Sequence, residues 1–346
     1  ARVDRTQRPY SGAIVIRFRS FRNQDPPRLA DLWQSAALGP LAMQPMTTAL
    51  LETAVFSKPY FDRHGLIVAT DDEHDGAILG FAHAGFGPNL ERTALDRSTG
   101  SIVMLVVPPH EQAGLIAAGL VEQARSYLHQ HGATTVFAGG GPTLGGFYLG
   151  LYGGADLAGI LDSSLAMQQS FQSQGFLEHD RVVVARRSIA GFRPPIDRVQ
   201  VAIRRSTQLT AIDEPDRRNW WEAALTTGIC LRRYDLRTRD SSLVATALFW
   251  DMQPMAAACG IAAAGLLDLQ VAPERRREGL GAYLLAEAMH DLGSEGISVV
   301  EAHAKTSNTA ATGLLSKLGY ETTCLGTIYR EPQAAVEPPQ ATTRAD

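Results

Sequence analysis

One pattern occurs twice in this chain of 346 residues, and it limits the possible folds more than any other feature does. The short apolar segment Val103–Pro108 is followed by Gly114 and then by a helix-forming stretch. The segment Asp268–Pro273 is followed in the same order by Gly279 and a second helix-forming stretch. Two copies of a strand, a loop and a helix indicate an internal repeat.

Other parts of the two halves also correspond. Near the end of each copy, Phe171–Phe176 is similar to Leu315–Tyr320. Near the start, Ile14–Phe18 and Val199–Arg205 each have the composition of a strand. Each is followed by a proline-containing turn and a stretch with helical character, at residues 28–37 and 215–226. The chain is therefore expected to hold two domains of one plan.

The domain boundary is expected where regular structure is interrupted. Gly191 and the pair Pro194–Pro195 break any helix or strand between the halves. The last residues contain several prolines and no apolar periodicity, which is typical of a disordered segment. We therefore expect a first domain over residues 1–188, a linker over 189–198, a second domain over 199–331 and a disordered tail over 332–346.

Composition excludes several classes of partner. The formal net charge is -4, so no strong field favours nucleic acid or an anionic membrane. No apolar run is long enough to span a bilayer, and the first residues do not have the pattern of a secretory signal. Cys230, Cys259 and Cys324 lie far apart without a CxxC pair, which predicts a cytoplasmic protein without disulfides or a metal site.

The second copy of the repeat has the composition of an anion-binding loop. The apolar segment Gly265–Ala272 stops at Pro273, and three arginines lead to Gly279, Leu280 and Gly281. A helix that begins there offers unpaired N–H groups and the positive end of its dipole. The glycines would let a phosphate approach the backbone, and the arginines would add positive charge.

Two common phosphate-binding motifs do not fit this loop. A Walker A loop ends in Gly-Lys-Ser or Gly-Lys-Thr, which this segment lacks. A dinucleotide-binding fingerprint needs GxGxxG after the first strand of a parallel unit, whereas one GxG stands here, late in its domain. The loop therefore predicts another kind of phosphate ligand.

The loop resembles the cofactor signature of the GNAT superfamily of N-acyltransferases, which is Arg/Gln-x-x-Gly-x-Gly/Ala after a strand ending near Val-x-Pro. Arg276, Gly279 and Gly281 occupy its fixed positions. A second landmark of the family follows in Asn308, Ala311 and the pair Gly319–Tyr320. The resemblance implies an α/β fold of the α+β type, with two tandem GNAT domains, each a mixed, mostly antiparallel twisted sheet flanked by helices.

The resemblance also implies the residues that bind acetyl-CoA, or another acyl-CoA, as co-substrate. Backbone groups near Leu269 and Val271 would pair with the pantetheine arm, and Asn308 would lie beside the pantetheine or its sulfur. The pyrophosphate would be held by the backbone N–H groups of Arg276, Arg277, Glu278, Gly279, Leu280, Gly281 and Ala282.

One position departs from the family's pattern. Many members carry a tyrosine four residues before the Gly-Phe or Gly-Tyr pair, where it protonates the departing thiolate, but this chain has Leu315. Tyr283, Tyr320 and Tyr329 are possible substitutes, although tyrosines within helices or strands are more often core residues. The general acid is therefore not identified by sequence.

Three residues are candidates for the base that takes a proton from the acceptor ammonium. Glu301 and His303 are two residues apart on an expected strand over 297–303, so they point to one face. Asp268 stands on the neighbouring strand, just before the loop. Each could instead be a hydrogen-bonded structural group, since titratable groups mark functional sites only statistically.

The first copy of the loop lacks the features that would bind pyrophosphate. Glu111 stands where the second copy has Arg276, and Ile116 where it has Gly281. The carboxylate would repel the ligand, and the branched side chain would cover the N–H groups. We therefore expect the first domain to be structural or to form one wall of the acceptor site.

The inserted stretch, residues 139–154, has two possible roles. It contains Phe147, Tyr148 and Tyr152, which could line a wall or lid over the acceptor site, or could pack between the domains. Trp220 and Trp221, on an expected helix, are more simply explained as core or interface residues.

The resemblance predicts transfer of an acetyl or other acyl group to a small-molecule or peptide amine by direct attack in the second domain. The cysteines have no activating context, which disfavours a covalent intermediate. Two alternatives stay open: a small-molecule acetyltransferase similar to mycothiol synthase, and a CoA-binding regulatory or scaffold protein without catalysis. No sequence feature determines the oligomeric state.

Overall fold

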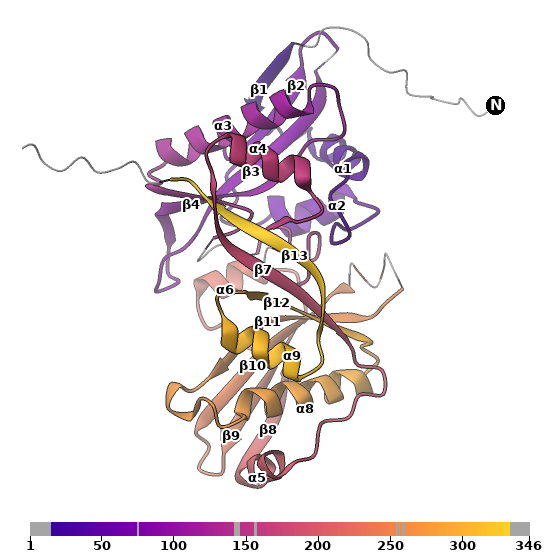
Figure 1. Ribbon diagram of the computed structural model, residues 1–346, viewed down its shortest axis with the longest axis vertical. Coiled ribbons are helices and arrows are strands. Elements are labelled where there is room, and N and C mark those ends of the chain that lie inside the picture. The colour runs from indigo at the N-terminus through magenta and orange to yellow at the C-terminus, as the bar shows by residue number, and fades with distance from the viewer. Residues whose placement is uncertain are drawn as a thin grey trace, which may run out of the picture.

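All strands of the structure belong to one sheet. The computed structural model describes residues 15–332, except 75, 142–145, 156, 157, 254, 256, 258 and 259. Within this part of the chain, the sheet has 13 strands in the order β1-β2-β3-β4-β5-β13-β7-β12-β11-β10-β9-β8, with the short β6 paired to β13. Figure 1 shows the two halves at opposite ends of the molecule, joined by long strands.

The first half contributes seven strands to the sheet. Most helices of this half lie on the two faces of the sheet (Figure 1). Its strands are β1 Ile16–Ser20, β2 Leu66–Asp71, β3 Ala77–Pro88, β4 Leu95–Val106, β5 Thr135–Ala138, β6 Ile160–Leu161 and β7 Leu177–Ser188. Its helices are α1 Pro26–Ser35, α2 Thr48–Leu51, the π-helix η1 Glu52–Phe56, α3 Ala113–Gln130 and α4 Leu165–Ser173.

The second half repeats this plan. Its strands are β8 Thr207–Asp213, β9 Leu231–Thr238, β10 Leu243–Asp251, β11 Ala263–Val271, β12 Val299–Lys305 and β13 Glu321–Arg330. Its helices are α5 Arg198–Ser206, α6 Trp220–Leu225, the 3₁₀ helix η2 Pro273–Arg275, α8 Leu280–Ser294 and α9 Thr309–Lys317.

The repeat seen in the sequence is confirmed by the strand pairing. In the first half, β4 and β5 are parallel and α3 connects them; in the second half, β11 and β12 are parallel and α8 connects them. Every other neighbouring pair of strands is antiparallel. The predicted fold class, a mixed and mostly antiparallel sheet flanked by helices, is therefore confirmed.

The last strand of each half lies across the junction between the halves. Strand β7 pairs with β12 from Ser188↔Val299 to Val182↔Lys305. Strand β13 pairs with β7 and also with β5, at Tyr329↔Ala138 and Arg330↔Phe137. Figure 1 shows β7 and β13 side by side as the bridge between the halves. The division of the chain between residues 188 and 199 remains a prediction, since the sheet runs through it without a break.

One expected strand is wrong. Val199–Arg205 forms most of helix α5, and the first strand of this half is the next segment, β8. The side chain of Asp197 accepts a hydrogen bond from the N–H of Gln200 at 2.8 Å and so caps the helix. The alternating apolar residues suggested a strand, but Val199 and Ile203 are four residues apart and both lie against Gly279.

The remaining expected elements lie close to their predicted positions. The strand expected at Ile14–Phe18 is β1, although Ile14 is outside the described residues. The helix expected over 215–226 is shorter, because the side chain of Asn219 caps it by accepting from the N–H of Glu222. The expected tail lies outside the described residues from residue 333 on.

Candidate functional site

Strands β11 and β12 part in the middle of the second half. They pair only at Ala263↔Val299, Ala264↔Val300 and Gly265↔Glu301. Beyond Glu301, β12 continues along β7, whereas β11 continues along β10 as far as Val271↔Ala245. The six residues from Leu266 to Val271 therefore form one side of a fork about 20 Å long, at about 3.3 Å per residue. On the edge of β11 that faces away from β10, the backbone groups of these six residues have no partner strand among the described residues.

The loop at the open end of the fork presents its backbone to a ligand. Arg277 and Gly279 have left-handed conformations, with φ of 67° and 87°, and helix α8 begins at once at Leu280. No described residue accepts a hydrogen bond from the N–H groups of residues 277–282. The first N–H groups of a helix carry partial positive charge, so this loop is suited to bind an anion.

The side chains of the loop carry its charge. Arg275 forms an ion pair with Glu278 at 2.8 Å, and Arg276 folds back so that its Nε lies 3.4 Å from the carbonyl oxygen of Val271. Arg276, Arg277 and Glu278 are all exposed, whereas Leu280 and Ala282, in the first turn of α8, are buried. The exposed arginines therefore add positive charge around the loop.

Gly281 lies between the fork and helix α9. A Cβ atom at this position would lie 3.5 Å from Val271, 3.6 Å from Leu314 and 3.9 Å from Leu269, which are ordinary contact distances. A methyl group would fit, but a larger branched side chain would fill the space between these residues. The structure thus places the predicted residues Leu269, Val271 and Gly281 together.

Asn308 has a structural role in addition to the predicted one. Its Oδ1 accepts a hydrogen bond from the N–H of Ala311 at 3.1 Å and caps helix α9. The residue is exposed, so its amide N–H₂ group faces outward and can act as a donor. The predicted contact with pantetheine would use this group.

The tyrosines considered as substitutes for Leu315 are core residues. Leu315 is buried in the cluster beneath α8 and α9, and so are Tyr283 and Tyr320. Tyr329 is buried in the first half, against Phe171. Burial raises the pKa of Tyr283, and the charge of Glu287 raises it further. In the described part of the chain, these positions offer no exposed phenol at the fork.

Glu301 and His303 lie together at the closed end of the fork. The Glu301 side chain is fully buried, and its Oε1 is 2.9 Å from Nε2 of His303. It also accepts hydrogen bonds from the N–H of Gly154 at 2.5 Å and from Nε of Arg186 at 2.6 Å. Burial acts to raise the pKa of Glu301, but His303, Arg186 and the Gly154 N–H outweigh it and lower the pKa to about 2.

Asp268 lies on the other side of the fork and is partly exposed. Its Oδ2 accepts hydrogen bonds from Arg218 at 2.9 Å and from Gln270 at 2.8 Å. Arg218 also holds Glu222 of helix α6 at 2.8 Å. The structure therefore brings Glu301 and His303 together and leaves Asp268 in a separate group with Arg218.

Several partners in the site could not be found by sequence. Arg218 belongs to the turn before α6, Arg186 to β7, and Gly154 to the inserted stretch of the first half. Each is more than forty residues from the group it contacts, and no local spacing connects them. A buried carboxylate at Glu301 did, however, require hydrogen-bond donors from somewhere in the fold.

The first half has the same fork, but the loop beside it differs from that of the second half. Strands β4 and β5 pair from Thr99↔Thr135 to Ile102↔Ala138, and then β4 continues along β3 as far as Val106↔Phe81. At the start of α3, Nδ1 of His110 accepts from the N–H of Gln112 at 3.0 Å. Ile116, at the position of Gly281, is fully buried, and Glu111 is exposed.

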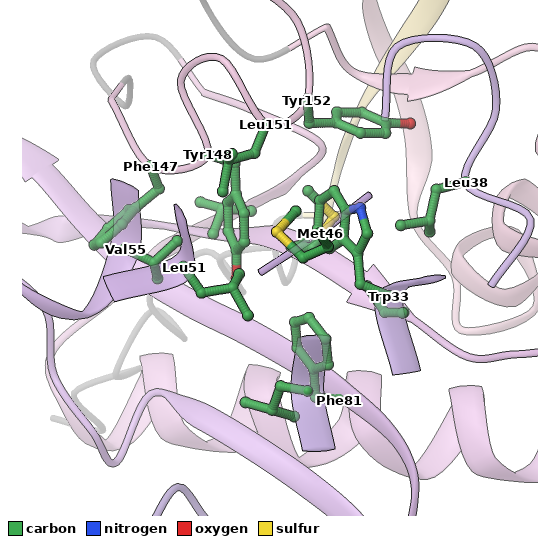
Figure 2. Packing of buried hydrophobic residues seen from close by; sticks show 14 of the residues in the cluster. Trp33, Leu38, Met46, Leu51, Val55, Phe81, Phe147, Tyr148, Leu151 and Tyr152 are labelled. Atoms are coloured by element: carbon green, nitrogen blue, oxygen red, sulfur yellow. The ribbon is translucent and has the colours of Figure 1, made fainter. Parts of the chain in front are cut away.

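The described aromatic residues of the inserted stretch pack inside the protein, and residues 142–145 of this stretch lie outside the described residues. Phe147, Tyr148 and Tyr152 are buried in one cluster with Trp33, and Figure 2 shows them around Trp33 and Met46. The ring of Tyr148 stacks on that of Trp33 with centroids 5.8 Å apart, and its hydroxyl lies 3.1 Å from Nδ1 of His83. These aromatic residues therefore form a core, which matches the alternative of packing rather than that of a lid.

No three His, Cys, Asp or Glu side chains among the described residues are arranged to hold a metal ion. Among the described helices, none is long and apolar enough to cross a membrane.

Comparisons with known proteins identify the fold. Residues 251–328 match the family model described as FR47-like protein. No curated protein matches the chain in sequence. A solved structure of a GCN5-related glucosamine N-acetyltransferase region, from a fungal multi-domain GH3 beta-N-acetylglucosaminidase, aligns with a TM-score of 0.68 and 16% identity. It covers 92% of this chain, which spans 38% of the length of that protein.

Two other solved structures match over their whole length. A tandem GNAT protein from the clavulanic acid biosynthesis pathway aligns with a TM-score of 0.62 and 14% identity, over 93% of this chain and 100% of that one. A GCN5-related N-acetyltransferase from Sphaerobacter thermophilus aligns with a TM-score of 0.59 and 16% identity, over 92% and 97%. The chain has the tandem GNAT fold that its sequence predicted.

Proposed function

We propose that the tandem GNAT fold of this chain serves transfer of an acyl group from acyl-CoA to an amine, and that the second half carries the reaction. The observation that supports this most directly is the loop over residues 277–282. Its N–H groups have no acceptor among the described residues, and they stand at the start of α8 beside an open fork. In the corresponding loop of the first half, His110 accepts a hydrogen bond from the N–H of Gln112, and Glu111 and Ile116 replace Arg276 and Gly281.

The fork and the loop match two parts of an acyl-CoA molecule. The pyrophosphate would accept hydrogen bonds from the N–H groups of residues 277–282, with Arg276 and Arg277 adding positive charge. The pantetheine arm carries amide groups, which would pair with the free backbone of Leu269 and Val271 in the way that an added strand does. The thioester would then lie inside the fork.

The proposed reaction is a single displacement. The nitrogen lone pair of the amine attacks the thioester carbon, the carbon–sulfur bond breaks, an amide forms, and CoA leaves as a thiolate. Unpaired backbone N–H groups in the fork would polarise the carbonyl oxygen. Leu315 has no proton to give, so we propose that the thiolate is protonated from solvent.

The acceptor must lose a proton, and Asp268 is the candidate base that the geometry supports best. Its carboxylate is partly exposed and only one of its oxygens accepts the hydrogen bonds from Arg218 and Gln270. Glu301, in contrast, is fully buried with three donors and a pKa near 2, so it is a weak base. We propose that Asp268 takes the proton directly or through one water molecule.

The proposal is tested by measuring free thiol released from acetyl-CoA with a panel of amines, which includes glucosamine, peptides and aminoglycosides. With an accepted amine, Asp268→Asn should lower kcat/KM at neutral pH by about 10²- to 10⁴-fold, the usual contribution of a general base. The exposed Asp240→Asn is the matched control and should behave as the native protein does.

Leu315 favours a second candidate, a CoA-binding protein without catalysis. In that case acetyl-CoA should bind, and raise the melting temperature, but no amine should cause thiol release.

Equal rates for Asp268→Asn and the native protein would keep acyl transfer and exclude Asp268 as the base. The panel of amines itself shows whether the acceptor is a small molecule, as in mycothiol synthase, or a peptide.

A further inference from the structure

The closed end of the fork is held by groups from the first half of the chain. Gly265↔Glu301 is the last pair before β11 and β12 separate. The carboxylate of Glu301 is held there by the N–H of Gly154, by Arg186 and by His303, at 2.5, 2.6 and 2.9 Å. Gly154 ends the inserted stretch and Arg186 lies on β7, so two of these three donors come from the first half.

The contact between Gly154 and the fork is reciprocal and close. Nε1 of Trp250, on β10, donates to the carbonyl oxygen of Gly154 at 2.5 Å. A Cβ atom on Gly265 would overlap both that oxygen and the indole of Trp250. Backbone therefore lies directly on backbone at this point, and a side chain at position 265 could not be accommodated without moving the first half away from the fork.

The electrostatics make this contact difficult to alter. A fully buried carboxylate needs all of its donors, because removal of one leaves charge without compensation in a medium of low dielectric constant. Burial tends to raise the pKa of Glu301, but its donors lower it to about 2, so it stays ionised at neutral pH. Glu301 is therefore a fixed negative charge rather than a group that gains and loses protons.

We propose that Glu301 is a positioning residue, and that the first half sets the angle between β11 and β12 through Gly154 and Arg186. This inference rests on the proposed function in that the fork is taken as the acyl site. It gives the first half a role that does not depend on an anion loop of its own: the fork in the second half has its geometry only when the inserted stretch is docked on it.

Two variants break the contact in chemically different ways. Glu301→Gln removes the charge and keeps the shape. Trp250→Phe removes the indole N–H that binds Gly154, together with part of the buried ring system, and changes no titratable group. Both are expected to lower kcat by about tenfold or more, because a buried polar group loses its partner. The dissociation constant for acetyl-CoA should change less than threefold, since the anion loop is untouched.

Matched controls separate positioning from a loss of stability. Tyr127→Phe removes a buried hydroxyl that donates to Asp62 at 2.9 Å, in the first half away from the inserted stretch and the fork. Asp25→Asn removes a fully buried carboxylate paired with Arg19. These two should lower the melting temperature and leave kcat unchanged. Amide hydrogen exchange over residues 266–271 should be faster only in Glu301→Gln and Trp250→Phe.

The pH profile distinguishes positioning from catalysis. Glu301→Gln and Trp250→Phe, the two fork variants, should keep the fall of kcat/KM at low pH, which is the acid limb of the profile. Asp268→Asn should remove this limb. Loss of that limb in Glu301→Gln, with native behaviour of Trp250→Phe, would make Glu301 the base and overturn the proposal. Kinetics and exchange equal to those of the controls would also overturn it. If Glu301→Gln does not fold, Trp250→Phe decides alone.

Failure of the proposed function can be distinguished from failure of the proposal that the first half positions the fork. If the native protein releases no thiol with any amine, acyl transfer is excluded for that panel. The coupling between the halves is then judged by hydrogen exchange, where faster exchange over residues 266–271 in both fork variants supports it and unchanged exchange contradicts it.

Discussion

At the scale of single residues, Gly281 is the position where one side chain would decide whether the anion loop is open. A Cβ atom there would already touch Val271 and Leu314, and the first half has the branched residue Ile116 at the matching place. We expect acetyl-CoA to raise the melting temperature of the native protein and Gly281→Ile to abolish this shift. Gly114→Ile is the matched control, because a Cβ atom at Gly114 meets open space.

The outcome of this pair of variants also identifies the half that binds the ligand. A Gly281→Ile protein that keeps the shift, together with a Gly114→Ile protein that loses it, would place the acyl-CoA site in the first half. Differential scanning fluorimetry with and without acetyl-CoA is sufficient for the measurement.

Glu301 should make the stability of the protein depend on pH in a defined window. Its partners lower the pKa from 4.5 in the unfolded chain to about 2 in the folded protein. This favours the folded state above pH 4.5, and the benefit is lost as the pH falls from about 4.5 toward 2. It amounts to about 3 kcal/mol at neutral pH, of which about 1 kcal/mol should be lost at pH 3.5.

Urea unfolding of the native protein and of Glu301→Gln at pH 7, 5 and 3.5 measures this effect. The difference in unfolding free energy between them should shrink only below pH 5. A constant difference over this range would show that Glu301 is not ionised in the way its donors require.

At the scale of elements, Asn308 caps a helix and has one proposed role in binding, and substitution can separate the two. Its Oδ1 caps α9, and its amide group is a proposed donor to pantetheine. Asn308→Ala should destabilise the protein by about 1 kcal/mol through loss of the cap. Asn308→Asp keeps an acceptor at the start of the helix, so it should retain stability and weaken acetyl-CoA binding. Calorimetric titration together with thermal unfolding tests both effects, and equal affinity for Asn308→Asp would exclude the contact.

The elements also show which parts of the fold were accessible from sequence. The β11–loop–α8 unit could be predicted because strand, proline, arginines and glycines follow one another within a few residues. The alternation of apolar residues from Val199 to Ile203 predicts a strand where α5 stands, whereas the cap that Asp197 provides favours the helix. The partners Gly154 and Arg186 of Glu301 could not be predicted, since only the folded sheet brings them near it.

At the scale of the whole molecule, the placement of β7 and β13 predicts how the two halves unfold. Strand β7 of the first half pairs with β12 and β13 of the second, and β13 pairs with β5, β6 and β7 of the first, so neither half has a complete sheet without the other. Backbone hydrogen bonds then run through the junction, and a buried sheet does not tolerate an unpaired central strand. We expect a single cooperative transition in calorimetry, and acetyl-CoA, bound to the second half, should shift the whole of it.

A proline in a central strand and a proline in an edge strand provide the contrast for this last prediction. Val184 of β7 is fully buried and pairs with both His303 and Cys324, so Val184→Pro removes a hydrogen-bonding N–H at the junction and should destabilise both halves together. Thr210 lies on β8, the last strand of the sheet, and Thr210→Pro should weaken the second half far less. Two separate transitions in the native protein, with only one shifted by acetyl-CoA, would mean that the shared strands do not couple the halves.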